Sequence, residues 1–488
     1  MKLLEPGAEV DGFVVQECIH AGGMAHIYRV AYASGAADPG FPMAMKIPRM
    51  TAGDGAENIV GFEVELQILP ALTGPHVPRF VAAGDLHRMP YLVMEYVTGH
   101  TLQHWLDDAS QPLDEGLMAR LGAAMAHAVH SLHQQNACHL DLKPGNVLFT
   151  NEDHAVLLDF GLSCHAHYPD LLAEEQRKAV GSPAWMAPEQ VVGVRGDPRS
   201  DIFAIGVMLY ELATGELPFG APTTAGGLRQ RLWMVPTPPR KHRPALAPWL
   251  QEIILRCLEP TAAQRYPSAA HLALDLSNPT QVRVTERGRR VEGASLGTQV
   301  KRWLKAAGMH YQPSPLPSRQ IEETPIVMVA VPHADVTDST LYSLREAVAR
   351  SLGIRPGARL ACVTVISPSA SSTSDSTRSE TALHRQHLAR LRQWAQPLDL
   401  TEHPVSYHVL EASDVAHALV RYAEGNHVSM MILGAATHGL QTQRFIATVP
   451  MRVARDAPCT VILVKQSLPF ARLGGASAAD AASPTLPT

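Results

Sequence analysis

Apolar and polar residues alternate along the first 276 residues in short runs that predict a compact mixture of strands and helices. Short apolar runs bounded by polar residues predict strands, and the stretch from near Asp114 to near Asn136 predicts a helix. The predicted strands are Phe13–Val15, Ile27–Val30, Met43–Lys46, Tyr91–Val97 and Ala155–Leu158.

A different pattern begins after residue 323. Runs in which every residue is apolar alternate there with helical stretches, which is typical of parallel strands buried on both faces of a sheet. The predicted strands are Ile326–Val331, Leu360–Ile366, Met430–Leu433 and Thr460–Val464, and the predicted helices are Leu341–Leu352, Leu383–Trp394 and Val415–Glu424. We therefore predict an α/β parallel-sheet domain at residues 324–467, with a long Ser/Thr-rich loop at residues 367–381.

Residues 278–323 separate the two patterns and combine a basic stretch with prolines at positions 313, 315 and 317. One interpretation is an extended tether with a solvated run of charges. The alternative is a short helix that docks on a neighbouring domain through one apolar face, formed by Val300, Trp303, Leu304 and Ala307. Residues 468–488, rich in Ala, Ser and Pro, are expected to be disordered.

The composition argues against several other classes of protein. A chain of 488 residues with 46% hydrophobic residues can form two to four packed domains, and its net charge of −5 gives no basic field for nucleic acid. The six cysteines lack paired spacing, as in a reducing compartment. The N-terminus lacks the apolar stretch of a signal peptide, and no apolar run reaches the ~20 residues of a membrane helix. We therefore expect a cytoplasmic protein without a membrane or nucleic-acid partner.

A polar segment follows the predicted long helix: His139-Leu140-Asp141-Leu142-Lys143-Pro144-Gly145-Asn146. After one more strand comes Asp159-Phe160-Gly161. Phosphoryl transfer requires a carboxylate that orients the attacking hydroxyl group, and metal ligands that help to neutralise the phosphates. Asp141, Asn146 and Asp159 provide these groups in a suitable order.

The first strands carry residues that suit a nucleotide. The segment between the first two strands contains adjacent glycines, whose missing Cβ atoms let backbone N–H groups approach phosphates. The strand at residues 43–46 ends in Lys46, a cation for the phosphates. Its expected partner is Glu65, because Leu66 and Leu69 place that helical face inward, whereas Glu63 lies on another face.

Together these residues resemble the bacterial Hanks-type Ser/Thr protein kinases over about residues 10–277. The resemblance implies an α+β bilobal protein kinase domain with an N-lobe at about 10–97 and a C-lobe at about 98–277. It implies a transferase that uses ATP with Mg²⁺ or Mn²⁺ to phosphorylate protein substrates. Asp141 and Lys143 would be catalytic, and Asn146 and Asp159 would bind the metal.

The same resemblance assigns further residues. The implied nucleotide contacts are Ile19, His20, Ala21, Gly22, Gly23, Met24, Ala25, His26, Ile27, Ala44, Lys46, Glu65, Met94, Glu95, Val97 and Leu148. Met94 would be the gatekeeper, with backbone groups of Glu95 and Val97 bonding adenine. The implied structural residues are His139, Phe160, Gly161, Asp201 as an anchor of the catalytic loop, and Glu189 paired with Arg265.

Several positions depart from the kinase pattern. His20 and Ala25 occupy positions where the family has glycine, and Leu140 replaces an arginine that would bind a phosphate on the activation loop. Residues 162–180, which form that loop, contain only Ser163 and Tyr168 as hydroxyl residues. Activation-loop phosphorylation is therefore not the expected switch. The position of Lys143 implies Ser/Thr specificity, with dual specificity left open.

Cys164, His165 and His167 look like clustered metal ligands, but no fourth ligand follows at usable spacing. We favour a polar loop segment over a metal site there.

Residues 324–467 resemble a universal stress protein domain, through the first strand, Met430–Gly434 and Val453–Val464. Members that bind ATP have an acidic residue after the first strand and the pattern G-x2-G-x9-G-[S/T]. Here Pro332 occupies the acidic position. Gly434 fits the first glycine, but Thr437 and Ala447 stand at the other two, with Thr448 in the hydroxyl place and Gly439 out of register. We expect weak ATP binding or none.

The leading hypothesis is a Ser/Thr kinase fused to a stress-protein-like module that regulates it, docks substrates or forms a homodimer through residues 324–467. A pseudokinase scaffold is the alternative, because of His20 and Ala25. A third possibility is that the module senses another small ligand.

Overall fold

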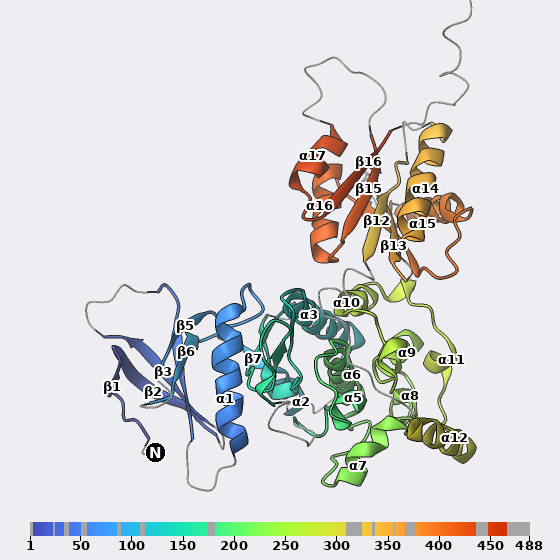
Figure 1. Ribbon diagram of the computed structural model, residues 1–488. Coiled ribbons are helices and arrows are strands. Elements are labelled where there is room, and N and C mark those ends of the chain that lie inside the picture. Colours follow the sequence, from blue (N-terminus) through green and yellow to red (C-terminus); the bar gives the residue numbers. More distant parts are fainter. Residues whose placement is uncertain are drawn as a thin grey trace, which may run out of the picture. The chain divides into compact units, whose positions relative to one another are not determined.

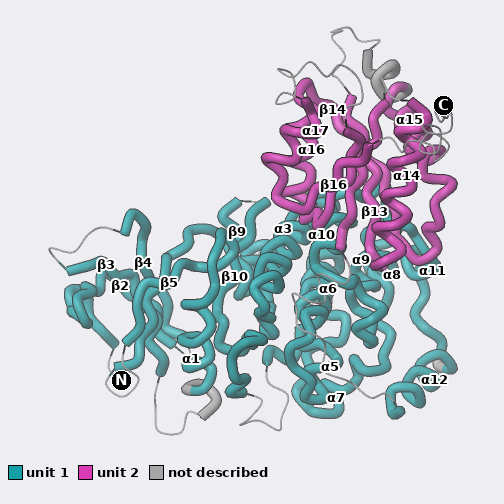
Figure 2. The backbone as a smooth tube through the Cα atoms, turned by 45° about the horizontal axis from the view of Figure 1, so that its top comes forward, with its two compact units in different colours: residues 1–322 teal, residues 323–488 magenta. Residues whose placement is uncertain are grey.

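The computed structural model describes residues 3–22, 25–33, 39–49, 56–84, 89–107, 113–151, 153–172, 181–308, 325–333, 337–355, 357–366, 376–435 and 448–465. The chain divides into two compact units, Met1–Glu322 and Glu323–Thr488 (Figure 2). Each unit has a hydrophobic core of its own.

The first unit begins with an antiparallel sheet whose described strands have the order β1-β2-β3-β4-β6-β5 (Figure 1). They are Glu9–Val10 (β1), Phe13–Ala21 (β2), Ala25–Tyr32 (β3), Met43–Pro48 (β4), Phe80–Ala83 (β5) and Leu92–Glu95 (β6). Met43, Met45 and Ile47 of β4 lie in the core of this sheet. Since side chains alternate along a strand, Lys46 lies on the other face, where helix α1 (Ala56–Ile68) packs.

Helices form the larger part of the first unit. Between β7 and residue 277 the described helices are α2 (Leu102–Asp107), α3 (Glu115–Gln134), α5 (Pro188–Val191), α6 (Arg199–Thr214), α7 (Ala225–Arg229), α8 (Pro239–His242), α9 (Pro248–Cys257) and α10 (Ala269–Ser277). Helix α3 begins where the sequence predicts it, because the Asp114 carboxylate accepts hydrogen bonds from the N–H groups of Gly116 and Leu117. Helix α6 ends at Gly215, whose φ of 74° is left-handed and suits a glycine.

Short strands lie directly before α2 and between α3 and α5. They are His100–Thr101 (β7), Ala137–Cys138 (β8), Val147–Asn151 (β9), His154–Leu157 (β10) and Cys164–His165 (β11). Strands β10, β9 and β7 form one small sheet, and β11 pairs with β8. The candidate catalytic residues lie in the turns that these strands fix.

The chain after α10 does not extend away as a spacer. Helix α11 (Glu286–Arg289) packs on α9, where the Gln251 side-chain amide donates to the carbonyl oxygens of Arg287, Gly288 and Arg290 at 2.7–3.1 Å. Arg287 also pairs with Glu252 at 2.8 Å. The tether interpretation was therefore wrong for residues 285–290, because a buried amide and an ion pair hold this segment on α9.

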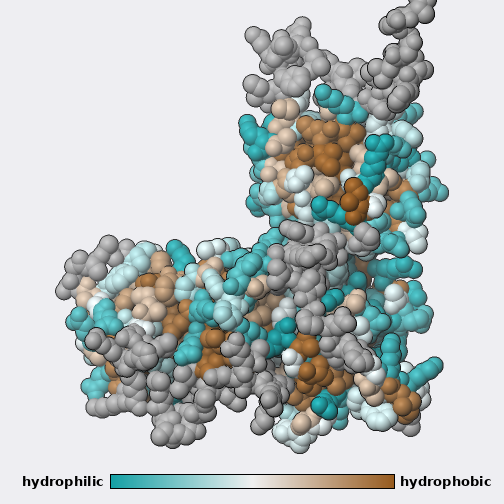
Figure 3. Space-filling model, in the orientation of Figure 1, coloured by the Kyte–Doolittle hydropathy of each residue, from teal (hydrophilic) through white to brown (hydrophobic). Residues whose placement is uncertain are grey.

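The short helix considered for residues 300–307 is present as α12 (Leu296–Ala307). Its apolar residues Val300, Trp303 and Leu304 are 54–61% exposed, and apolar side chains are visible at the surface of α12 in Figure 3. The predicted docking of this face is therefore not seen in the described residues. The prolines at 313, 315 and 317 lie outside those residues.

The second unit contains a parallel sheet whose described strands have the order β14-β13-β12-β15-β16. The strands are Ile326–Ala330 (β12), Arg359–Ile366 (β13), Val405–Glu411 (β14), Met430–Gly434 (β15) and Thr460–Val464 (β16). The helices are Asp338–Gly353 (α14), Ser376–Ala395 (α15), Val415–Gly425 (α16) and Val449–Asp456 (α17). Helices α14 and α15 cover one face and α16 and α17 the other (Figure 1). The predicted α/β parallel-sheet class is confirmed.

Two predictions for this unit were incomplete. Helix α15 begins at Ser376, inside the segment predicted to be a loop, because polar residues occupy the exposed face of a helix as readily as they occupy a loop. Strand β14 was missed because it lies at the edge of the sheet and its burial alternates instead of being continuous. The predicted disordered tail lies outside the described residues.

Candidate active site

Three charged side chains meet between the two lobes of the first unit. The Lys46 ammonium group on β4 lies 2.6 Å from the Glu65 carboxylate on α1 and 2.9 Å from the Asp159 carboxylate after β10. Glu65 is only 1% exposed, whereas the Asp159 side chain is 40% exposed. The network joins residues separated by up to 113 positions in the sequence.

Lys46 and Asp159 keep their charges near neutral pH. Burial opposes the charged form of Lys46, but the carboxylates of Glu65 and Asp159 outweigh it and raise the pKa of Lys46. The Lys46 cation lowers the pKa of Asp159 to about 2. Asp159 is therefore a carboxylate throughout the physiological range, as a metal ligand must be.

Helix α1 reaches this network because glycines line its approach. A Cβ atom on Gly61 would lie 3.2 Å from the carbonyl oxygen of Gly161, which is closer than ordinary side-chain contacts. The backbone N–H of Phe160 donates to Glu65 at 3.3 Å. Gly61 and Gly161 thus permit the helix to place Glu65 against Lys46 and the Asp159 segment.

Asp141, Lys143 and Asn146 converge in the turn between β8 and β9. The Lys143 ammonium group lies 3.2 Å from the Asp141 carboxylate. The Asn146 side-chain amide donates to the Asp141 carbonyl oxygen at 2.9 Å. Oδ2 of Asp141 is the atom nearest Lys143, and Oδ1 accepts the backbone N–H of Ser182 at 2.8 Å. Asp141 is 8% exposed, so these bonds fix its direction.

The backbone of this turn is anchored from beneath by Asp201 at the start of α6. Its two carboxylate oxygens accept the N–H groups of His139 and Leu140 at 2.9 and 2.8 Å. The ring of His133 on α3 lies 2.8 Å from the same carboxylate. Burial acts to raise the pKa of Asp201. The hydrogen bonds that its carboxylate accepts act in the opposite direction and help to lower this pKa below its usual value.

Two residues in this region have left-handed backbones. Leu140 has a φ of 62° and Asp159 a φ of 64°, conformations that non-glycine residues rarely adopt and that cluster at functional sites. The His139 ring lies tilted against the Phe160 ring with centroids 5.2 Å apart, and one of its nitrogens lies 3.0 Å from the carbonyl oxygen of Leu158. The surrounding contacts therefore hold Leu140, next to Asp141, and Asp159 in strained but defined conformations.

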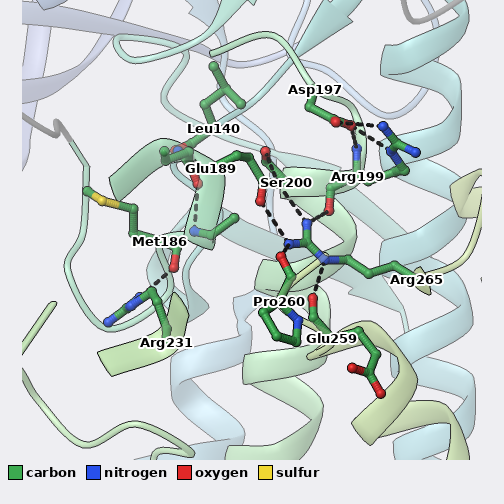
Figure 4. A network of polar contacts seen from close by, with 12 residues as sticks. Leu140, Met186, Glu189, Asp197, Arg199, Ser200, Arg231, Glu259, Pro260 and Arg265 are labelled. Atoms are coloured by element: carbon green, nitrogen blue, oxygen red, sulfur yellow. Dashed lines mark hydrogen bonds and ion pairs between the residues drawn. The ribbon is translucent and has the colours of Figure 1, made fainter. Parts of the chain in front are cut away.

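Glu189 and Arg265 form a buried ion pair behind the site (Figure 4). Both Arg265 terminal nitrogens bond the Glu189 carboxylate at 2.7 and 2.8 Å, and the Ser200 hydroxyl donates to the same carboxylate at 2.6 Å. The adjacent Gln190 amide donates to the Leu140 carbonyl oxygen at 2.8 Å. The pair therefore supports the segment that contacts the catalytic turn.

The segment after Asp159 is held by a cation that sequence reasoning missed. Arg195 contacts the Asp170 carboxylate and the Leu162 carbonyl oxygen, each at 2.8 Å. Ser163 is 1% exposed and donates to the His139 carbonyl oxygen at 3.1 Å. His133, Gln190 and Arg195 carry no recognisable local motif, so only their tertiary contacts reveal them.

The described residues among the expected nucleotide contacts lie on strands β2, β3, β4, β6 and β9, on helix α1, in the turn after β2 and in the segment after β6. Residues 19–22 and 25–27 belong to the β2–β3 hairpin, while Gly23 and Met24 lie outside the described residues. Ala44 faces Met94 in the β4–β6 pair. Ala44 and Leu148 are buried, and Glu95 and Val97 are partly exposed at the end of β6.

The comparison with protein families decides the classification. The protein kinase domain model matches residues 14–275, more than half of the chain. The chain belongs to the protein kinase family. A universal stress protein family model matches residues 326–465 of this kinase-family chain.

Its relatives include serine/threonine-protein kinase pkn3 of Myxococcus xanthus, 30% identical over 336 residues, which are 67% of this chain and 57% of the relative. Serine/threonine-protein kinase PkaA of Streptomyces coelicolor is 34% identical over 253 residues, 50% of this chain and 44% of the relative. Serine/threonine-protein kinase PknB of Mycolicibacterium smegmatis is 27% identical over 238 residues, 48% of this chain and 38% of the relative. The kinase-family chain thus spans less than two thirds of each of these relatives.

In the stress-protein unit, Pro332 follows β12 and Gly434 ends the neighbouring strand β15. Thr448 is the residue before α17, whereas Thr437, Gly439 and Ala447 lie outside the described residues. Within the described residues, none of the helices has the length and apolar character needed to cross a membrane.

Proposed function

We propose that the first unit transfers the γ-phosphoryl group of ATP to serine and threonine hydroxyls of proteins, as a non-specific serine/threonine protein kinase. The observation that carries this proposal is the Lys46–Glu65–Asp159 network facing the fixed Asp141–Asn146 turn. Each of these groups has a defined role in phosphoryl transfer, and the supporting contacts described above hold each of them.

Lys46 would bind the α- and β-phosphates, oriented by Glu65. Asn146 and Asp159 would hold Mg²⁺ or Mn²⁺, because an amide oxygen and a carboxylate with a pKa of about 2 are the hard oxygen ligands these ions prefer. The bound ion would neutralise charge on the phosphates. Asp141 would accept the hydrogen bond of the substrate hydroxyl, and Lys143 would stabilise the transferred phosphoryl group.

The decisive assay supplies ³²P-labelled ATP, Mg²⁺ and a generic basic protein, and identifies the labelled amino acids after hydrolysis. We expect phosphoserine and phosphothreonine, and label on the chain itself. Omission of the divalent ion should abolish transfer. If wild-type protein binds ATP but transfers no label under any condition, the pseudokinase scaffold replaces this proposal.

We predict that Ser163→Ala combined with Tyr168→Phe lowers the phosphorylation rate less than about tenfold, because the lost hydrogen bond of Ser163 is worth about 1 kcal/mol. Ser163 is too buried to be phosphorylated. The Asp170 carboxylate already pairs with Arg195, so this segment does not need a phosphate group to hold it in place. Steady-state rates with a peptide substrate measure the effect.

Arg195→Met is the contrasting variant, and we expect it to lower kcat more than the double substitution does, because it releases the Asp170 segment. If the double substitution abolishes activity while removing a phosphate detected by mass spectrometry, activation-loop phosphorylation is the switch after all.

For the second unit we propose a regulatory, substrate-docking or dimerisation role. Strand β16 lies at the edge of the sheet with partly exposed residues, and Leu463 is 36% exposed. Figure 3 shows apolar side chains gathered over β15 and β16. An exposed apolar edge strand is a template for association with a second copy. Sedimentation equilibrium of the full chain measures this association.

We predict that residues 320–470, prepared as a fragment, bind ATP with a Kd weaker than about 1 mM. Pro332 supplies no carboxylate, and Thr437 and Ala447 carry Cβ atoms where glycine would let the backbone approach phosphates. Isothermal titration calorimetry with Mg–ATP is the measurement, and micromolar binding would contradict the prediction. A cytoplasmic location remains a prediction from the cysteine pattern.

A further inference from the structure

A cavity of about 420 Å³ lies within the second unit, between helices α14 and α15 and beside the carboxyl ends of β12 and β13. Its apolar wall is formed by Leu341, Leu391 and Trp394. This volume falls in the range of small-molecule pockets, which combine apolar walls with a few polar groups. The Trp394 indole N–H is already bonded to the Leu341 carbonyl oxygen at 3.3 Å, so its ring serves as a fixed surface.

Three polar atoms on the cavity lining are buried without a hydrogen-bond partner among the described residues. They are the Thr364 hydroxyl oxygen on β13, Nδ1 of His387 on α15, and Nε of Arg345 on α14. Thr364 is 3% exposed and His387 is 6% exposed. Buried polar groups are almost always bonded, so three such groups around one cavity indicate a missing partner.

The lining also has an excess of positive charge. Arg345, Arg390 and a single acidic residue, Asp338, line the cavity. His333 and His387, also on the lining, lie edge to face with ring centroids 5.1 Å apart. Burial and the nearby cationic groups, including His333 and Arg390, lower the pKa of His387. The missing partner is therefore a hydrogen-bond acceptor with negative charge.

We propose that this cavity binds a small organic anion, in which a phosphate or carboxylate group contacts Arg345, Arg390 and Thr364 and an apolar body lies against Trp394. Arginine suits both kinds of anion, because its planar guanidinium group can donate two parallel hydrogen bonds. Pro332, which occupies the acidic position of the nucleotide pattern, lines this cavity, whereas Gly434, the first glycine of that pattern, ends β15 on the other side of β12. The proposal does not depend on the kinase activity of the first unit.

The probes are phenyl phosphate and benzoate, with phenol as the uncharged control. Each is titrated into the full chain by calorimetry, with a saturating non-hydrolysable ATP analogue and Mg²⁺ present to fill the kinase cleft. We expect saturable binding of at least one anion and none of phenol. Phosphate and carboxylate specificity are separated by which of the two anions binds more tightly.

The test variant is Arg345→Gln with Arg390→Gln, and we expect it to weaken anion binding about a hundredfold, since each charge-assisted hydrogen bond contributes about a factor of ten or more. The matched control is Arg350→Gln on the same helix, an exposed arginine paired only with Glu346 in the described residues, and it should bind as wild type does. Circular dichroism and the thermal midpoint without probe verify that both variants fold.

Thr364→Val provides an independent test. Because it removes a buried hydroxyl without a described partner and keeps the shape of the side chain, it should leave the thermal midpoint unchanged or raise it, yet weaken anion binding severalfold. The proposal is overturned if neither anion binds saturably below about 10 mM. It is equally overturned if the double arginine variant and Arg350→Gln bind with the same affinity.

Discussion

Replacing Asp141 by asparagine is expected to lower the rate of phosphoryl transfer by about 10²–10⁴-fold, the usual effect of removing a positioned acid–base group. Asparagine keeps the size of the side chain and can still accept the Ser182 N–H through its amide oxygen, but it cannot take up the proton of a substrate hydroxyl. The ion pair between Asp141 and Lys143, whose charged atoms lie 3.2 Å apart, is also lost.

The measurement is label transfer from ATP to a protein substrate at saturating ATP, with ATP affinity determined separately. We expect the affinity to change little, because the Lys46–Glu65–Asp159 network is untouched. Arg421→Gln, an exposed change in the second unit, is the control. An Asp141→Asn protein as active as wild type would mean that the observed phosphorylation comes from a contaminating kinase or from another base.

The second large effect concerns stability. Replacing Arg265 by methionine is expected to destabilise the first unit by about 3–5 kcal/mol, because it leaves the Glu189 carboxylate buried without its cation. Arg265 also donates to the carbonyl oxygens of Glu259, Pro260 and Arg199, so these groups lose partners as well. Urea unfolding is the measurement, followed through the transition that ATP shifts to higher urea.

A double-substitution cycle separates the ion pair from the remaining contacts. Glu189→Gln with Arg265→Met should be more stable than Arg265→Met alone, since it removes the uncompensated buried charge. If the double variant is no more stable than Arg265→Met, the loss comes from the carbonyl contacts and packing of Arg265 instead. Arg421→Met, an exposed arginine in the second unit, should cost less than about 1 kcal/mol.

Local pattern was sufficient for much of the fold. Continuous apolar runs predicted β12, β13 and β15, because strands covered on both faces carry mostly apolar side chains. A run of the same kind predicted β16, although this edge strand is partly exposed. The edge strand β14 was not predicted, because one of its faces is partly exposed and its apolar run is therefore interrupted. Residues 285–290 were predicted to be part of a solvated tether, because their basic residues have no acidic partner nearby in the sequence. In the structure, Arg287 pairs with Glu252 on α9 and with Glu259, which follows α9.

Some residues of the candidate site could likewise be predicted from the sequence, and others could not. The sequence by itself determined the residue types Lys46, Asp141, Asn146 and Asp159, their order and their spacing, because phosphoryl transfer needs those groups and short motifs carry them. The helical pattern around Leu66 also predicted Glu65 as the partner of Lys46, and the structure has that contact at 2.6 Å. Only the tertiary structure showed that His133, Gln190 and Arg195 support the turn and the segment after Asp159. Likewise, only the fold brought Arg345, Thr364 and Arg390 around one cavity. The physical reason is that a motif is local in sequence, whereas charge neutralisation and burial depend on neighbours that the chain supplies from a distance.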